Sequence, residues 1–472
     1  MIKFQSTLTP RQKFFILCLD FVILMGSLAL SFFLRIGEVN RELFTANAFW
    51  LIPLIIVIFY YILGTYDLDG KVKLKDLYFR SLLASLLGFL VIIGINYFFA
   101  KERMGIFGRG ILIPSLFLHY SVSLIFRAWL WRWFNSKASE MEWLILAAES
   151  SINLLINEAK KSNWRGKYYF LLPPEEFKNT DWDKKFSDLN SNNIQFKAFG
   201  SWLELEQKIN RLWTSIVVAV SWRDFPADLS RMLMVARLSG QSVLEISEFY
   251  ERNFRKIPVD FLGPEWFIFE KGFELLHNPL GLRIKRLCDL FLALLLLFLA
   301  WPLMLLAALA IKMESAGPAL YRQIRTGQGG RDFTILKFRS MGINAESKGA
   351  QWASQKDPRI TKVGKFIRLT RIDELPQLIN VIKGEMSFVG PRPERPEFNQ
   401  TLDKEISFYN LRHLVRPGLT GWAQINYPYG ASREDAKEKL QYELFYIKNH
   451  SLFLDMQVVL KTIKVVLFGQ GR

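Results

Sequence analysis

Long apolar runs dominate the first quarter of the chain. They lie near Phe14 to Leu34, Phe49 to Gly64, Ser81 to Phe99 and Ile106 to Phe126. Each run has about 16 to 22 residues, which is enough for a helix to cross the hydrocarbon layer of a bilayer. The pattern predicts a domain of four transmembrane helices over residues 1–135.

Basic residues between the runs indicate how this bundle is oriented. Those of the second loop and those that follow the fourth run are Lys71, Lys73, Lys75, Arg80, Arg127, Arg132 and Lys137. Lys and Arg gather in cytoplasmic loops, so both ends of the bundle are predicted to be cytoplasmic, although a basic third loop argues against it. Asp20 lies near one end of the first run, where reaching interfacial water is the favoured interpretation and a functional buried carboxylate is the alternative.

The middle of the chain, residues 140–264, alternates short apolar runs with helical patterns. Two runs, Trp143 to Ala148 and Ile216 to Val220, read as strands of a small α/β domain with a parallel sheet. A glycine-rich turn would be needed after the first strand to admit a pyrophosphate, and Glu149 stands there instead. The domain is predicted to have a nucleotide-binding shape without binding a nucleotide, and to serve assembly or regulation.

A fifth apolar run, Leu290 to Ile311, contains Pro302 near its middle. If it crossed the membrane, the strongly basic tail after it would be moved to the side opposite the α/β domain. Proline deletes a backbone hydrogen bond and bends a helix. The preferred interpretation is therefore a re-entrant helix over about residues 285–312, which enters and leaves the membrane on the same side. A plain kinked span is the alternative, because proline is common in membrane helices.

Composition limits the partners. The chain has 472 residues, 50% of them hydrophobic, and a formal charge of +17 from 61 Lys and Arg against 44 Asp and Glu. Such charge suits anionic lipids, anionic substrates or nucleic acid, but no nucleic-acid-binding motif is evident, so no nucleic acid is expected. Two isolated cysteines, Cys18 and Cys288, exclude a disulfide framework and a zinc site of clustered thiols.

Side chains suited to a phosphorylated substrate gather in the last third of the chain. Lys337 and Arg339 alternate on a strand-like segment and could hold an anion, or belong to a solvated strand face. Asp373 and Glu374 precede Pro376, which is tolerated only in the first turn of a helix, so a helix is predicted to begin near the acidic pair. A carboxylate there could attack phosphorus and its neighbour could hold a divalent metal, or the pair could simply occupy the first turn of a surface helix.

Two further motifs follow. Arg392 stands between Pro391 and Pro393, which stiffen the backbone on both sides and fix the direction of a guanidinium suited to phosphate. The segment 416–424, RPGLTGWAQ, reads as a glycine-rich turn that either closes over a ligand or joins two elements.

Together these motifs resemble the bacterial sugar transferase family, the polyprenyl-phosphate hexose-1-phosphate transferases. The resemblance covers about residues 283–472 and includes KFRSM at 337–341, DPRITKVGKFIR at 357–368 and DELPQLINVIKGEMSFVGPRP at 373–393, besides RPGLTGWAQ. It implies a membrane α-helical bundle plus α/β fold, made of four transmembrane helices, a Rossmann-like α/β domain and a re-entrant-helix catalytic domain of mixed α/β structure. Many relatives have a small residue before the kink proline, and this chain has Trp301.

The resemblance also implies roles for residues. Asp373 would be the nucleophile that takes a sugar phosphate from a UDP-sugar, and Glu374 would help to hold Mg2+. The phosphate contacts would come from Lys337, Arg339, Arg368 and Arg392, and Pro302 would form the kink of the re-entrant helix. The acceptor would be undecaprenyl phosphate, in the first membrane step of surface polysaccharide or O-antigen synthesis.

Two other kinds of membrane protein are alternatives to this enzyme. A channel is disfavoured because the apolar runs carry little beyond Asp20 to line a path. A catalytically silent scaffold of a polysaccharide assembly machine remains open, since the first half of the chain suits assembly. The predicted location is the bacterial inner membrane, with the catalytic domain on the cytoplasmic face and a homodimer as the expected assembly.

Overall fold

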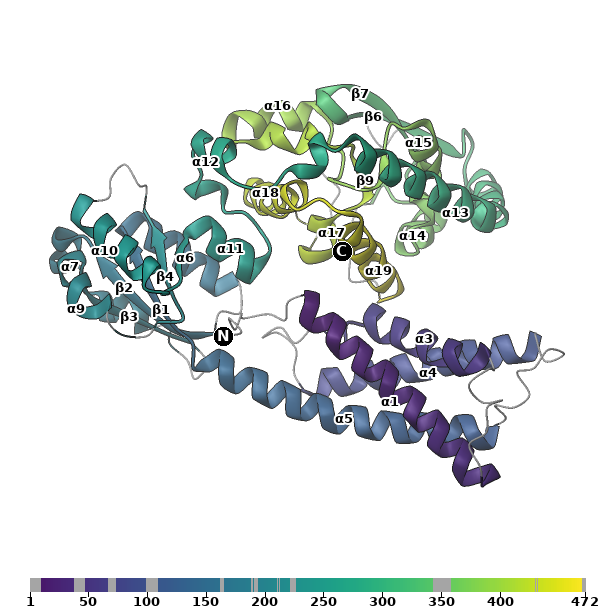
Figure 1. Cartoon of the computed structure of the whole chain (residues 1–472). Helices are drawn as coiled ribbons and strands as arrows, with labels where there is room; N and C mark the ends of the chain where they lie inside the picture. Colours follow the sequence, from purple (N-terminus) through teal and green to yellow (C-terminus); the bar gives the residue numbers. More distant parts are fainter. Residues whose placement is uncertain are drawn as a thin grey trace. The chain divides into compact units, whose positions relative to one another are not determined.

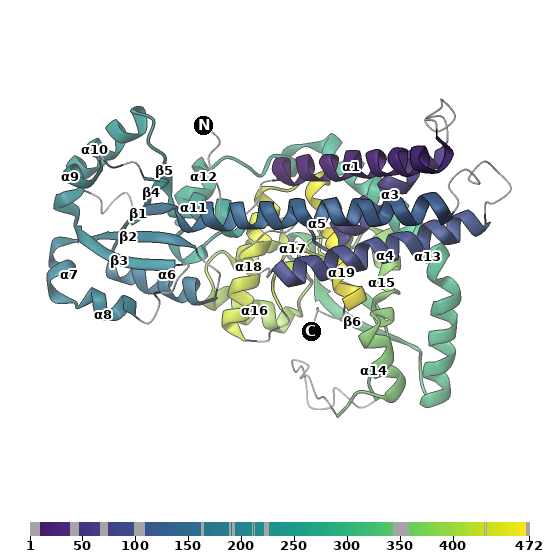
Figure 2. The same cartoon turned by 90° about the horizontal axis from the view of Figure 1, so that it is seen from below.

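A computed structural model shows the protein as two compact units, Met1–Asn253 and Phe254–Arg472. Figures 1 and 2 show their elements from two directions. The structure describes residues 10–37, 47–66, 74–98, 109–161, 165–187, 190, 194–209, 211, 213–220, 226–342, 358–428, 430 and 432–468.

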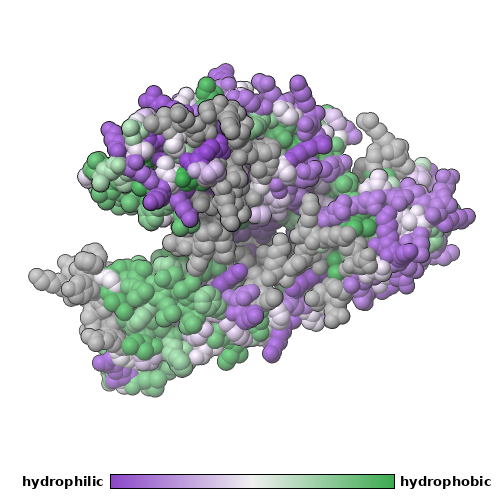
Figure 3. All heavy atoms as spheres, turned by 180° about the vertical axis from the view of Figure 1, so that it is seen from behind, coloured by the Kyte–Doolittle hydropathy of each residue, from purple (hydrophilic) through white to green (hydrophobic). Residues whose placement is uncertain are grey.

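The first unit begins with the helical bundle that the apolar runs predict. Its helices are α1 (Pro10–Ile36), α3 (Asn47–Ile62), α4 (Leu74–Phe98) and α5 (Arg109–Ser139). Three of them, together with α13 (Pro279–Glu314) of the second unit, are long and apolar enough to cross a membrane. The fourth, α3, has 16 residues and so is about 24 Å long, short of the hydrocarbon thickness. These helices make the chain a multi-pass membrane protein, and Figure 3 shows hydrophobic surface gathered over the bundle.

The loops that carry the orientation argument fall mostly outside the described residues, including Lys71 and Lys73 and the third loop. Inside the bundle, Asp20 differs from its prediction, because it is fully buried rather than in contact with interfacial water. Its Oδ2 accepts a 2.7 Å hydrogen bond from Nη2 of Arg127 on α5, and Ser123 Oγ donates to its Oδ1 at 3.3 Å. A charge in an apolar bundle needs a partner, and the distant Arg127 supplies it.

The second part of this unit is an α/β domain, as predicted. Five parallel strands pair in the order β3-β2-β1-β4-β5, a doubly wound arrangement. The strands are β1 (Glu142–Ala147), β2 (Gly166–Leu172), β3 (Ile194–Ser201), β4 (Ser215–Ala219) and β5 (Val243–Glu245). The helices are α6 (Glu149–Lys161), α7 (Pro174–Asn179), α8 (Trp182–Ser187), α9 (Leu205–Ile209), α10 (Ala227–Leu238) and α11 (Ile246–Phe254).

The turn after β1 carries a carboxylate contact in place of a glycine-rich loop. Glu149 begins α6, and its backbone N–H donates a 2.6 Å hydrogen bond to the carboxylate of Glu176. Lys185 pairs with the Glu149 side chain at 3.0 Å. A helix N-terminus after the first strand is where a dinucleotide fold holds pyrophosphate. Here a carboxylate of the chain itself occupies that position.

The second unit is built on α13, an antiparallel hairpin and a cluster of short elements. Strands β6 (Leu320–Thr326) and β7 (Asp332–Phe338) form the hairpin, and β8 (Ser387–Val389) pairs in parallel with β9 (Gly418–Thr420). The helices are α12 (Pro264–Phe269), α14 (Lys362–Leu369), α15 (Gln377–Lys383), α16 (Pro396–Glu405), α17 (Trp422–Asn426), α18 (Arg433–Lys448) and α19 (Leu452–Phe468).

Helix α13 changes direction along its length. In Figure 1 its first part runs across the view and its end is seen along the axis, whereas Figure 2 shows that end from the side. Both parts pack on the same unit: Ala293 belongs to one core cluster, and Ala307 with Ile311 to another. Many of the residues between them, such as Phe298, are exposed. Pro302 lies within this helix and supplies a physical cause for the bend, while insertion as a re-entrant helix stays a prediction.

Candidate active site

The acidic pair lies in a single 3₁₀ turn, η7 (Ile372–Glu374), between α14 and α15. Arg371 starts this turn in the left-handed conformation, with φ of 60°. Pro376 caps α15, which begins at Gln377, so the prediction of a helix starting beside the pair is confirmed. The helix has only seven residues, and the carboxylates precede it instead of occupying its first turn.

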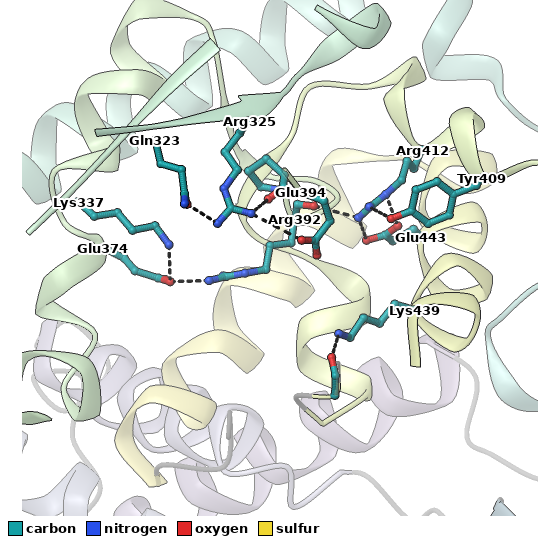
Figure 4. Close-up of polar contacts among 12 residues, drawn as sticks. Gln323, Arg325, Lys337, Glu374, Arg392, Glu394, Tyr409, Arg412, Lys439 and Glu443 are labelled. Carbon is teal, nitrogen blue, oxygen red and sulfur yellow. Dashed lines mark hydrogen bonds and ion pairs between the residues drawn. The ribbon is translucent and has the colours of Figure 1, made fainter. Parts of the chain in front are cut away.

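Glu374 is the centre of a cationic cluster that comes from three parts of the sequence (Figure 4). Arg392 Nη2 donates to Glu374 Oε1 at 2.8 Å, and Lys337 Nζ lies 3.7 Å from the same oxygen. Arg371 Nη1 lies 3.6 Å from it. Although burial opposes ionisation, these cations outweigh it and hold the pKa of Glu374 well below its ordinary value. Glu374 is therefore ionised at neutral pH.

Asp373 has the opposite environment. It is 8% exposed, and its Oδ1 is buried without a hydrogen-bond partner among the described residues. Burial, and then repulsion from Glu374, raise the pKa of Asp373 to about 6, while Lys337 and Arg368 act in the other direction. Such a carboxylate is ionised at neutral pH but poorly stabilised, which leaves its oxygen available to a reacting group.

Lys337 is the most deeply buried of the three cations beside Glu374. Burial lowers its pKa to about 8, although the charge of Glu374 opposes that shift. It comes from β7, where it pairs with Tyr321 of β6, so the hairpin fixes its position. Arg368 lies on α14, half-buried and near enough for its charge to act on Asp373.

The loop that carries Arg392 is held from both sides (Figure 4). Arg412 Nη2 donates to the Arg392 carbonyl at 2.9 Å, and Arg325 Nη1 donates to the Pro393 carbonyl at 3.2 Å. Arg412 is itself buried and forms two hydrogen bonds with Glu443, at 2.8 and 2.9 Å. Two flanking prolines and two buried donors therefore fix the direction of the Arg392 guanidinium.

Arg339, a sequence-predicted phosphate ligand, makes other contacts. Its guanidinium donates to the carbonyls of Ser315 at 2.8 Å and Ala316 at 2.7 Å, just after the end of α13. In this structure it ties α13 to the strand that carries Lys337.

The glycine-rich turn of segment 416–424 joins two elements, β9 and α17. A Cβ atom on Gly418 would lie 2.1 Å from the backbone nitrogen of Gly390, so two backbones pass each other where only glycine fits. Its role here is to bring β9 against β8, which leads into the loop of Arg392.

A buried ionic network anchors α13 beneath this loop. Lys285 Nζ donates to Asp455 Oδ2 of α19 at 2.6 Å. Asp289 accepts from Ser387 Oγ at 2.8 Å and from the Phe388 backbone N–H at 3.0 Å. The membrane helix and the loop of Arg392 are thus positioned by one set of contacts. Sequence reasoning missed the contacts of these residues, together with Arg325, Arg412 and Glu443, because their partners lie far away along the chain.

The acidic pair fits a magnesium ion that is also held by its substrate. All three cations approach Oε1 of Glu374, and Oε2 forms no hydrogen bond or ion pair within the described part of the chain. Asp373 Oδ1 is unpartnered beside it. Mg2+ is usually held by one or two carboxylates together with phosphate oxygens and water. No group of three or more metal-ligating side chains occurs in the described residues, so phosphate would have to complete the site.

Comparisons with known proteins identify the relatives of this chain. The sequence profile described as bacterial sugar transferase matches residues 280–469. A UDP-N-acetylgalactosamine-undecaprenyl-phosphate N-acetylgalactosaminephosphotransferase of Aeromonas hydrophila is 43% identical over 259 residues, which are 55% of this chain and 60% of the relative. A UDP-glucose:undecaprenyl-phosphate glucose-1-phosphate transferase of Escherichia coli (strain K12) is 44% identical over 182 residues, 38% of this chain and 39% of the relative.

The chain thus spans less than two thirds of the length of these two relatives. A UDP-glucose:undecaprenyl-phosphate glucose-1-phosphate transferase of Caulobacter vibrioides is matched more fully. It is 42% identical over 214 residues, which are 44% of this chain and 79% of the relative. The profile, these similarities and the site residues lead to one conclusion: the chain belongs to the bacterial sugar transferase family.

Proposed function

We propose that this protein transfers a sugar-1-phosphate from a UDP-sugar to undecaprenyl phosphate, at the cytoplasmic face of the bacterial inner membrane, for polysaccharide synthesis. The observation that carries the proposal is the contrast within the acidic pair. Asp373 has a buried, unpartnered oxygen, whereas Glu374 beside it is held ionised by three cations. The names of the similar proteins support the donor and acceptor classes.

The reaction proceeds in two displacements at one phosphorus atom. An Asp373 carboxylate oxygen attacks the β-phosphorus of the UDP-sugar, and the bond from that phosphorus to the oxygen bridging the two phosphates breaks. UMP leaves with that oxygen and its electron pair, and an aspartyl phosphosugar remains. A phosphate oxygen of undecaprenyl phosphate then attacks the same phosphorus, forming the lipid diphosphate sugar and freeing the carboxylate.

The surrounding residues stabilise charge during both displacements. Arg392, fixed by Arg412 and Arg325, and the half-buried Arg368 are placed to neutralise phosphate oxygens. Mg2+, when held by Glu374 and the diphosphate, would stabilise the leaving phosphate. Lys337 keeps Glu374 ionised and adds positive charge.

Membrane placement suits the acceptor. An isoprenoid tail keeps its phosphate at the bilayer surface, and α13 is a long apolar helix whose far end leads directly into the β6–β7 hairpin with Lys337. A re-entrant α13 would hold the acidic pair at headgroup level. The bundle and the α/β domain would then serve assembly, for which a homodimer is our expectation.

The test is UMP release by the purified full-length protein in detergent, with Mg2+, undecaprenyl phosphate and a panel of UDP-sugars. We expect release with at least one donor, its loss in Asp373→Ala, and radiolabelled sugar phosphate trapped on wild-type protein when the acceptor is omitted. Glucose, galactose and N-acetylgalactosamine donors come first. Folded protein that releases no UMP from any donor would support the silent scaffold instead.

A further inference from the structure

A cavity of about 760 Å3 opens on the other side of the β6–β7 hairpin from the acidic pair. Its wall includes Arg322 of β6 and Leu336 of β7, which are paired across the hairpin. Because side chains alternate along a strand, these two residues face away from Tyr321 and Lys337, the next pair along. None of Asp373, Glu374, Lys337 or Arg392 lines the cavity.

The cavity is lined by more cations than acids. Its basic residues are Arg322, Arg331, Lys383 and Arg416. None of these four has a hydrogen bond or ion pair from its side chain within the described residues. Four cations that share one wall without partners repel one another, so an anion between them would be stabilised.

The two acids of the wall do not neutralise these cations. Asp332 accepts a hydrogen bond from Thr326 Oγ1 at 3.2 Å, and Glu385 accepts one from Asn380 Nδ2 at 2.7 Å. Both carboxylates are thus directed toward neighbouring polar groups of their own segments. Four cations against two acids leave the wall with a formal charge of +2.

The cavity lies beside the start of the membrane helix α13. Gly384, in its wall, ends α15 in the left-handed conformation with φ of 85°, and a Cβ there would lie 3.4 Å from Arg286 Nη2. Arg286 belongs to α13 and donates to the carbonyls of Val381 at 2.6 Å and Ile382 at 2.8 Å.

Immediately after Arg286, the outer surface of α13 becomes apolar. Leu287 and Phe291, one turn apart, are each 66% exposed. An exposed apolar surface of this kind belongs in the hydrocarbon layer, and phospholipid phosphates lie at its boundary. Insertion of α13 from Leu287 onward would place the cavity at the depth where lipid headgroups are found.

We propose that this cavity is a second anion site, which binds the phosphate group of an anionic phospholipid headgroup beside the start of α13. The site is separate from the acidic pair and does not depend on the reaction proposed above. A bound headgroup would neutralise the cations of the wall and fix the depth at which α15 and the hairpin stand over the bilayer. Free inorganic phosphate has the same chemistry and is the other source to be tested.

The experiment measures the thermal midpoint of the full-length protein in dodecyl maltoside, without divalent metal, against rising dioctanoyl phosphatidylglycerol. Dioctanoyl phosphatidylcholine and inorganic phosphate are titrated in parallel. A ligand at concentration c that binds only folded protein stabilises it by RT ln(1 + c/Kd), so the rise of the midpoint with ligand concentration gives an apparent Kd. We expect phosphatidylglycerol to raise the midpoint more than either of the others at equal concentration.

The variant is Arg322→Gln/Lys383→Gln, and the control is Lys404→Gln, an exposed lysine of α16 outside the cavity. We expect the double variant to bind phosphatidylglycerol roughly thirtyfold more weakly, the factor for two basic residues removed near a membrane surface. The control should keep the wild-type Kd. Thr334→Glu, which adds a carboxylate to the same wall, provides a second variant if the first one fails to fold.

Wild-type affinity for phosphatidylglycerol in both cavity variants would overturn the proposal. Equal stabilisation by inorganic phosphate, lost in the same variants, would overturn the lipid headgroup as the ligand and leave a free-phosphate site. Stabilisation by all three ligands that no cavity variant weakens would place the binding elsewhere on the protein.

Discussion

Neutralising the two adjacent carboxylates should change stability in opposite directions. Asp373→Asn removes a charge that destabilises the folded protein, because burial and repulsion from Glu374 raise the pKa of Asp373 to about 6. Glu374→Gln removes a charge on which Arg392, Lys337 and Arg371 converge. Both changes nearly preserve side-chain shape, so they compare two charges within one turn of the chain.

The magnitudes follow from the two environments. Burial raises the Asp373 pKa from 3.8 to about 6, which at pH 8 lowers the free energy of unfolding by about 3 kcal/mol. Because the folded pKa is the higher one, this penalty is complete above about pH 6 and disappears as the pH falls toward 4. Glu374→Gln instead leaves three cations without their carboxylate, and because Arg371 and Arg392 are about a third exposed, the cost should be about 1–3 kcal/mol.

The assay is the thermal midpoint of each full-length variant in detergent with EDTA, at pH 8 and again near pH 5. At pH 8, we expect Asp373→Asn to raise the midpoint by roughly 2 to 10 °C and Glu374→Gln to lower it. The gain from Asp373→Asn should shrink near pH 5. Equal destabilisation by both variants at pH 8 would refute the electrostatic reasoning for the site.

Three other predictions concern activity and the buried ion pairs. The kcat/KM for the UDP-sugar should fall below about pH 6 with a limiting slope of one, because the attacking Asp373 must be ionised; a pH-independent rate between pH 5 and 8 would contradict this. Arg412→Met should destabilise the protein by about 3–5 kcal/mol, since it leaves the Glu443 carboxylate buried and unpaired. In urea titrations, Arg412→Met/Glu443→Leu should recover the lost stability. The double variant should not recover the rate of UMP release, because Arg412 also holds the loop of Arg392. Asp20→Asn should lower the thermal midpoint in detergent by leaving Arg127 uncompensated, and Asp20→Asn/Arg127→Gln should restore part of the loss.

The sequence predicted those features that depend on local patterns. Apolar runs located the membrane helices, and the helix beside the acidic pair followed from Pro376 alone. The parallel sheet followed from two apolar strands and the helical patterns between them, whereas its strand order did not. In each case, one short stretch of chain contains the physical cause.

Pairings between distant residues could not be predicted in this way. Asp20 was assigned to interfacial water because its partner, Arg127, lies 107 positions away. Arg339 looked like a phosphate ligand by its spacing from Lys337, but the end of α13 offers two carbonyls to its guanidinium. Nothing in the sequence near Arg392 indicated that Arg412 and Glu443 would fix its direction, because that depends on how η8 (Tyr409–Leu414) packs on α18.

The exposed surface of α13 has a practical consequence for handling the protein. Only 11% of the apolar stretch of α13 is buried, although the helix lies entirely in the second unit, residues 254–472. A fragment of residues 254–472 would lack the whole helical bundle but would still contain α13 as a membrane anchor. Such a fragment should stay in the pellet after an alkaline carbonate wash and enter solution only with detergent. Removing the bundle is therefore no route to a water-soluble enzyme.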